Sequence, residues 1–138
     1  MKISGAGTQL SALKKMAGPN IEFLGRLSDE ELAQAYSKAK AFVFAADEDA
    51  GITLLEAQAS GIPVVAYKKG GALEAVIEGV TGEFFEQQTE ESLVEKLKNF
   101  DVAKYDRLVI RSNAEKYSQQ NFQKLIKEFV LEKYENRT

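Results

Sequence analysis

The sequence contains neither cysteine nor histidine. Without cysteine, the chain can form no disulfide bond and offers no thiolate to a metal ion. Without histidine, it lacks the commonest general base and metal-binding side chain of proteins. Catalysis within the chain would therefore depend on carboxylates, amides and backbone dipoles, and we expect no metal site.

The sequence also lacks long apolar runs and an excess of positive charge. No apolar run approaches the ~18 residues of a membrane-spanning helix, and no signal peptide is recognisable. The formal net charge of −3 argues against nonspecific binding to nucleic acid, which usually requires a basic surface. We therefore expect a cytoplasmic chain that does not bind nucleic acid.

Length and composition are those of one globular domain. A chain of 138 residues can bury about 70% of the surface that it exposes when unfolded. Hydrophobic residues make up 44% of the chain and charged residues 28%, which is close to the average of globular proteins. We therefore expect a single domain over residues 1–138.

Short apolar segments alternate with longer segments of helical periodicity. This alternation predicts an α/β fold with a mostly parallel sheet and right-handed crossovers. One helix has a recognisable start, because Ser28 and Glu31 form a capping box, and it carries Leu32 and Tyr36 on one face. The expected strands cover residues 2–4, 21–24, 41–45, 63–67 and 82–85, and the expected helices cover residues 9–16, 28–39, 52–60, 72–77, 90–99 and, with a break near 118–121, 105–134.

Glu48 and Glu56 lie on either side of an abrupt change from strand to helix. The apolar residues 41–45 are typical of a buried strand, and ligands of parallel α/β sheets bind where strand carboxyl ends meet helix amino ends. The first helical amides, of Ile52 and Thr53, can bind an anion there. The pattern favours a ligand with both phosphates and hydroxyls, such as a nucleotide sugar. The alternative is a solvated acidic loop followed by an ordinary surface glutamate.

Over nearly its whole length the chain resembles the donor-binding domain of retaining glycosyltransferases of family 4, which have the two-domain GT-B fold. The resemblance implies a Rossmann-like parallel sheet with helices on both faces. Its segments occur in the family's order: IEFLGRLSDEEL at 21–32, EDAGITLLEA at 48–57 (the E-x7-E signature), ASGIPVVA at 59–66, GGALE at 70–74 and GVTG at 79–82.

The resemblance assigns the acidic loop to the donor sugar. Glu48 would contact the hydroxyls of the sugar and lie nearest its anomeric carbon, as the catalytic residue. Asp49, Ala50 and Gly51 would line the sugar pocket, largely through their backbone amides. The family usually has an aromatic residue where this chain has Ala50, and loss of that ring would loosen the pocket or alter the choice of donor.

By the same resemblance, the helix that follows and an earlier loop would bind the nucleotide part of the donor. Ile52 and Thr53 would bind the distal phosphate through the start of the helix, and Glu56 would hold the ribose. Arg26 and Leu27, just after a strand, correspond to the edge of the site that contacts the nucleobase. The backbone near Leu27 would make that contact.

Gly70 and Gly71 end one strand and open a helix, so their backbone can approach a ligand closely. Direct contact with the donor and a purely structural turn remain equally open. Lys68 and Lys69 precede them and would offset the charge of a pyrophosphate, although surface lysines are more often simply solvated.

The implied reaction transfers a hexose from a nucleotide diphosphate sugar, with retention of configuration, to a glycan or glycolipid. The pattern looks most like that of mannosyltransferases, so the expected donor is GDP-mannose or a UDP-sugar, without cofactor or metal. The alternatives are a GT-B nucleotide-sugar epimerase, an enzyme like glycogen synthase, and a non-catalytic binding or interaction module.

Relative to this family, the chain starts at the second strand of the donor domain. The first strand and the whole acceptor domain would be absent, so we expect no transfer by this polypeptide alone. Contact with a membrane surface would come only through the absent domain. The gap in the sheet predicts self-association or a strand from a partner, unless the two halves close up directly. The last helix, with Phe122, Leu125 and Phe129 on one face, would be a core or an inter-domain helix.

Overall fold

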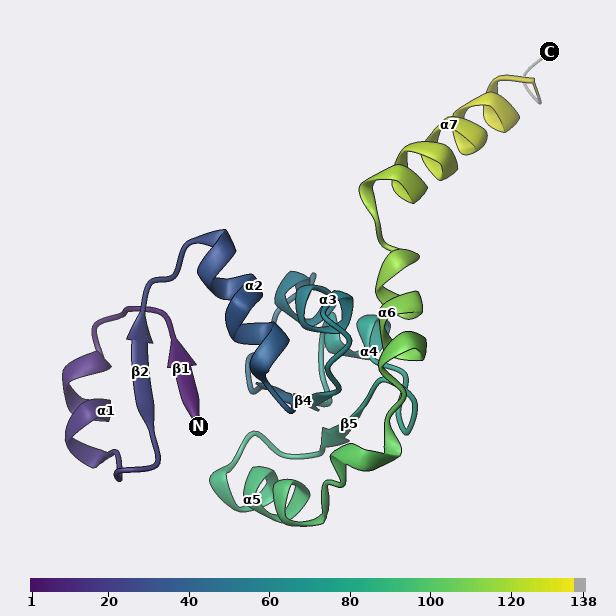
Figure 1. The fold of residues 1–138 in the computed structure, drawn as a ribbon. Coiled ribbons are helices and arrows are strands. Elements are labelled where there is room, and N and C mark those ends of the chain that lie inside the picture. Colours follow the sequence, from purple (N-terminus) through teal and green to yellow (C-terminus); the bar gives the residue numbers. More distant parts are fainter. Residues whose placement is uncertain (136–138) are drawn as a thin grey trace. The chain divides into compact units, whose positions relative to one another are not determined.

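The computed structural model describes residues 1–135, and it confirms an α/β fold with parallel strands (Figure 1). The chain divides into two compact units, Met1–Ala35 and the remainder from Tyr36 onward. The strands belong to two separate parallel sheets, β1-β2 and β3-β4-β5. Closure of the gap in the sheet, by self-association, by a strand from a partner or by the two halves themselves, stays a prediction.

The first unit is one β-α-β element followed by the start of a helix. Strand β1 (Lys2–Ser4) pairs in parallel with β2 (Glu22–Gly25), and α1 (Leu10–Met16) lies between them in sequence. Helix α2 (Asp29–Lys38) follows β2 and continues into the second unit. Each element begins or ends within two residues of its predicted bounds.

The predicted capping box at the start of α2 is confirmed. The amide of Ser28 donates to a carboxylate oxygen of Glu31 at 2.8 Å, and the amide of Glu31 donates to the Ser28 hydroxyl at 3.3 Å. Asp29 and Glu30 add negative charge in the first turn, where the helix dipole favours it. Residues at the start of α2 therefore determine where this helix begins.

The second unit contains a three-stranded parallel sheet in the order β3-β4-β5. Its strands and the helices that connect them alternate along the chain, as the hydrophobic pattern predicts. In chain order these elements are β3 (Phe42–Phe44), α3 (Ile52–Ala59), β4 (Val64–Tyr67), α4 (Ala72–Ala75) and β5 (Gly82–Phe85).

Four further elements follow the sheet. They are α5 (Glu90–Asn99), the short 3-10 helix η1 (Val102–Lys104), α6 (Arg107–Glu115) and α7 (Gln119–Glu135). The start of α5 is capped by the side chain of Thr89, and the 3-10 helix was not expected from the sequence. The predicted break in the last helical segment is confirmed, since α6 and α7 are separate helices.

The core lies where α3 and α6 pack together beside the sheet. Strand β4 is the central strand, and Val64, Val65 and Ala66 are completely buried, because β4 has a neighbour on each side. Leu54 of α3 and Ile110 of α6 are also fully buried. This core therefore holds the carboxyl ends of the strands and the start of α3 in place.

A network of buried amides joins α3, α4 and α6. The side-chain amide of Asn113 donates to the Gln58 side-chain oxygen at 2.8 Å and to the Ala75 carbonyl at 3.0 Å. The amide of Gln58 donates to the same Ala75 carbonyl at 2.8 Å. Gln58 is completely buried and Asn113 nearly so. Because the side-chain amides of Gln58 and Asn113 both have hydrogen-bond partners, the network stabilises one relative placement of the three helices.

The apolar face of α7 is not part of a core. Of the residues of this helix, all of which the structure describes, none is buried. Of the two expectations for α7, the core helix is therefore wrong for this chain and the inter-domain helix stays a prediction, because periodicity shows that a helix has an apolar face but not what covers it. The exposed residues of that face are Phe122, Leu125, Ile126, Phe129 and Val130.

Replacing Asn113 by alanine should destabilise the second unit, because it leaves the buried side-chain oxygen of Gln58 without its donor. We expect the free energy of unfolding to fall by about 1–3 kcal/mol, measured by urea denaturation. Asn99→Ala is the matched control, since its exposed amide only donates to the Glu95 carbonyl of the same helix, and its effect should stay within about 0.5 kcal/mol. Equal losses in the two variants would contradict this role of the network.

Candidate functional site

The loops at the carboxyl ends of β3, β4 and β5 contact one another. The Gly71 amide, after β4, donates to the Glu48 carbonyl in the loop after β3 at 2.7 Å. The side-chain amide of Gln88, after β5, donates to the Ala45 carbonyl at 2.8 Å. The structure thus assembles one edge of the sheet from three segments that are distant in sequence, at the edge where parallel α/β sheets bind ligands.

Gly70 and Gly71 lie directly against the acidic loop. A Cβ atom on Gly70 would be 2.5 Å from the Glu48 carbonyl oxygen, and one on Gly71 would be 2.6 Å from the Asp49 carbonyl oxygen. Gly70 also has a φ of +57°, which side chains with a Cβ rarely adopt. The glycine pair is therefore required by the packing of two backbones, which explains it without a ligand.

Both lysines before the glycine pair form ion pairs with carboxylates. The Lys69 ammonium lies 2.7 Å from Asp47 in the acidic loop, and the Lys68 ammonium lies 2.6 Å from Glu86 after β5. The hydrogen bond to Asp47 raises the pKa of Lys69. Since both pairs are largely exposed, they add little to stability, but they link the three loops by charge.

The start of α3 is open. Gly51 precedes the helix with a φ of +58°, and no side chain within residues 1–135 caps it. The Leu54 amide bonds to the Gly51 carbonyl at 2.9 Å, so the amides of Ile52 and Thr53 belong to the unfilled first turn. Both residues are exposed. The first turn of α3 therefore leaves its amides available, and the binding of an anion there stays a prediction.

Glu48 and Glu56 are both exposed, one on each side of the start of α3. Ala50 and Asp49 are also exposed, whereas Gly51 is buried. Burial, followed by the nearby charge of Glu56, raises the pKa of Tyr36 to about 12. Hydrophobic periodicity places Tyr36 on the apolar face of α2 but says nothing about the surroundings of its hydroxyl.

Arg26 and Leu27 belong to the first unit, where they follow β2. Arg26 is exposed and Leu27 is half-buried. The loop before them is fixed by a hydrogen bond from the Gly5 amide to the Gly25 carbonyl at 2.7 Å. Their assignment to the nucleobase stays a prediction.

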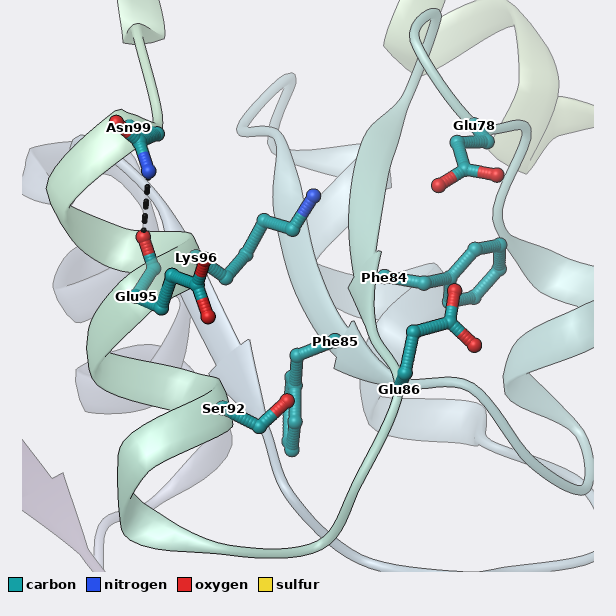
Figure 2. A pocket seen from close by; sticks show the side chains of 8 residues that line it. All are labelled: Glu78, Phe84, Phe85, Glu86, Ser92, Glu95, Lys96 and Asn99. Atoms are coloured by element: carbon teal, nitrogen blue, oxygen red, sulfur yellow. Dashed lines mark hydrogen bonds between the residues drawn. The ribbon is translucent and has the colours of Figure 1, made fainter.

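A cavity of ≈ 260 Å³ lies between β5 and α5, apart from the start of α3. Figure 2 shows Lys96 extending from α5 toward β5, with Glu78 and Glu86 on the other side of that strand. The remaining lining residues are Phe84, Phe85, Ser92, Glu95 and Asn99. The sequence carries no signal for this cavity, because the walls come from separate elements that share no motif.

Glu83 anchors α5 and the segment after it to β5. Its carboxylate accepts from the Lys96 ammonium at 2.9 Å and from the Tyr105 hydroxyl at 3.1 Å. The hydrogen bond from Lys96, together with that from Tyr105, lowers the pKa of Glu83 although burial acts in the opposite direction. Burial and the Glu83 hydrogen bond raise the pKa of Tyr105, so this hydroxyl stays protonated.

Residues 1–135 contain neither a cluster of metal-binding side chains nor a membrane-spanning helix. No group of three or more Asp, Glu, His or Cys side chains among residues 1–135 is arranged to hold a metal ion. No helix in the same part of the chain has the length and apolar character needed to cross a membrane.

Replacing Gly70 by alanine should disturb the acidic loop, since the new Cβ would meet the Glu48 backbone. We expect a loss of about 1–3 kcal/mol in the free energy of unfolding and amide NMR shifts over residues 47–51. The control is Gly7→Ala, because no described atom lies within 4 Å of a Cβ there and no positive φ is involved. Unchanged stability of the Gly70 variant would refute the packing argument.

Acid should weaken the contact between Glu83 and Lys96. A carboxyl group with a lowered folded-state pKa contributes stability above its ordinary value of 4.5, and this contribution disappears as the pH falls through the lowered value. Urea unfolding of the wild type should therefore lose stability on acidification from pH 7 to about pH 3, more steeply than Glu83→Gln does. The exposed control Glu95→Gln should keep the wild-type slope, and parallel slopes for all three would contradict the assignment.

Comparison with known proteins identifies the family. The family described as "Glycosyl transferases group 1" matches residues 3–117. The sulfoquinovosyl transferase SQD2 of Arabidopsis thaliana is 35% identical over 122 residues, which are 82% of this chain and 24% of that protein. A GDP-mannose-dependent monoacylated α-(1-6)-phosphatidylinositol monomannoside mannosyltransferase of Corynebacterium glutamicum is 38% identical over 85 residues, 54% of this chain and 22% of that protein. The chain thus spans about a quarter of the length of these relatives.

Solved structures show the same fold. A sucrose-phosphate synthase from Thermosynechococcus elongatus matches with a TM-score of 0.80 at 22% identity, over 99% of this chain and 39% of that one. Anabaena HepE in complex with UDP-glucose matches with a TM-score of 0.65 at 26% identity, over 98% of this chain and 40% of that one. The chain therefore belongs to the glycosyl transferases of group 1 and shares its α/β fold with GT-B glycosyltransferases.

Proposed function

We propose that the chain is the donor-binding domain of a retaining hexosyltransferase that uses a nucleotide diphosphate sugar. The observation that carries the proposal is the open first turn of α3 between two exposed carboxylates, Glu48 and Glu56. Backbone amides suit phosphates, and carboxylates suit sugar hydroxyls. A nucleotide diphosphate sugar has a diphosphate between two sugars, so it offers partners to both kinds of group.

Each part of the donor has a proposed partner. The amides of Ile52 and Thr53 would bind the distal phosphate and stabilise the charge that develops on the leaving diphosphate. Glu56, one turn into the helix, would accept hydrogen bonds from the ribose hydroxyls. Glu48 would contact the transferred hexose near its anomeric carbon, with Ala50 lining the same pocket.

The identity of the donor is proposed from the relatives. One is named for its dependence on GDP-mannose, and one related structure holds UDP-glucose. We therefore propose GDP-mannose or a UDP-hexose as the donor, with a glycan or glycolipid as the acceptor and no metal in the reaction. Because the chain spans about a quarter of the relatives, an acceptor-binding domain would supply the rest of the active site.

Amide NMR titrations of the purified chain with GDP-mannose and with UDP-glucose test this proposal. Resonances from Gly51 to Glu56 should shift, and the tighter ligand would identify the base. Glu56→Ala should weaken binding tenfold or more, because two charge-assisted hydrogen bonds, each worth about 1.5–3 kcal/mol, are lost. Glu91→Ala removes another exposed helical glutamate and should bind as the wild type does.

A dispersed spectrum that responds to neither nucleotide would reject donor binding by this chain and would favour a non-catalytic interaction module. Equal affinities of the wild type and Glu56→Ala would reject the assigned role of that carboxylate.

A further inference from the structure

The Asp47 carboxylate is held by two contacts with the turn that follows β4. One of its oxygens lies 2.7 Å from the Lys69 ammonium. The other lies over Gly70, where a Cβ atom would be only 3.1 Å from it. The backbone of this turn is itself fixed, because the Lys69 amide donates to the Tyr67 carbonyl at 2.8 Å. The Asp47 side chain therefore has a defined position against the turn, although it lies at the surface.

Glu48, the next residue, lies between two anchored neighbours. Its own carbonyl accepts from the Gly71 amide at 2.7 Å, and the Asp49 carbonyl oxygen lies 2.6 Å from the place of a Gly71 Cβ. On the other side, Asp47 is held by its ion pair. The Glu48 side chain is exposed and forms no ion pair within residues 1–135. Its backbone is thus restrained, while its carboxylate stays accessible to a ligand.

Lys69 also changes the electrostatics of the acidic loop. Asp47, Glu48 and Asp49 are three consecutive carboxylates, and charges of one sign repel one another at this spacing. The Lys69 ammonium opposes the charge of the first carboxylate, so the repulsion within the loop is smaller. Because the ion pair is exposed, salt screens it and its energy is modest. A modest energy is nevertheless enough to change how often a surface loop occupies one position.

We propose that Asp47 and Lys69 are positioning residues, which keep Glu48 where it meets the transferred hexose without touching the donor themselves. The inference rests on the proposed function, in which Glu48 contacts the sugar. The pair acts on the sugar part of the donor alone, because the first amides of α3 and Glu56, which would hold the nucleotide, belong to a helix that Leu54 anchors in the core. Loss of the pair should therefore reduce the affinity that the hexose adds.

A second ion pair at the same turn provides a matched comparison. The Lys68 ammonium lies 2.6 Å from Glu86, and both side chains are exposed, as in the first pair. This pair joins the turn to the loop after β5 rather than to the acidic loop. A general effect of surface charge, or of any ion pair at this turn, would appear in both pairs. Positioning of Glu48 would appear only in the pair of Asp47 and Lys69.

The experiment measures what the hexose adds to the affinity of the full chain. Calorimetric titration gives the ratio of the dissociation constants of GDP and GDP-mannose, and of UDP and UDP-glucose. The loop variant, Asp47→Asn/Lys69→Gln, removes the ion pair at constant net charge. It should lower the ratio about twofold to fivefold and leave the affinity for the nucleotide diphosphate alone unchanged. The control variant, Lys68→Gln/Glu86→Gln, should keep the wild-type ratio, and so should Lys69→Arg, because a guanidinium can pair with the same carboxylate.

The outcomes separate the inference from the proposed function. An unchanged ratio in the loop variant, equal losses in the loop and control variants, or equal weakening of GDP and GDP-mannose would each overturn the inference and leave the proposed function standing. In a Glu48→Ala background the loop variant should have no further effect, since the pair acts through Glu48, and a further loss would also overturn the inference. A wild type that binds no nucleotide, or whose ratio is one, would refute the proposed function or its role for Glu48, and the inference with it.

Hydrogen exchange of the Gly71 amide reports on the loop without any ligand, because this amide is freed when the loop moves away from the turn. Exchange should be about twofold to fivefold faster in the loop variant than in the wild type, and unchanged in the control variant. The difference should shrink as salt is raised to about 1 M, where the Debye length falls to about 3 Å. Equal exchange of Gly71 in all three proteins would overturn the inference.

Discussion

The close approach of two backbones, the acidic loop after β3 and the glycine pair after β4, is the constraint on which the candidate site depends. The Gly71 amide bonds to the Glu48 carbonyl, and the space for a Cβ on either glycine is filled by backbone atoms of that loop. The conformation of the loop sets the position of Gly51, and Gly51 opens α3. This contact helps to fix the course of the loop that leads from Glu48 into the first turn of α3.

The buried core also holds the carboxyl-terminal edge of the sheet in place. The amide network of Gln58, Asn113 and the Ala75 carbonyl joins α3 to α4 and α6, and Leu54 anchors the first turn of α3 in the core. A network without unpaired members stabilises one arrangement rather than several. Glu56 therefore lies on the exposed face of a helix whose opposite face is fixed in the core.

Most of the fold could be predicted from sequence, because its signals are local. The capping box of Ser28 and Glu31, the apolar strands and the glycine turns each identify an element, and the observed bounds agree closely. The division of the strands into two sheets and the exposure of α7 could not be derived from periodicity, since they depend on what covers an edge or a face. At the site, the spacing of Glu48 and Glu56 was visible in the sequence, but the ion pair between Lys69 and Asp47 joins two loops, and only the folded chain brings those two residues together.

The packing of the acidic loop on Gly70 and Gly71 separates two properties that are usually coupled in a binding loop. Its course is set by main-chain atoms, whereas the side chains of Asp49 and Ala50 point into solvent and take no part in that packing. Exchange of these side chains would change the chemistry of the surface while the frame of the loop stays the same. Such a loop can diversify during evolution, or be redesigned for another sugar, at little risk to folding.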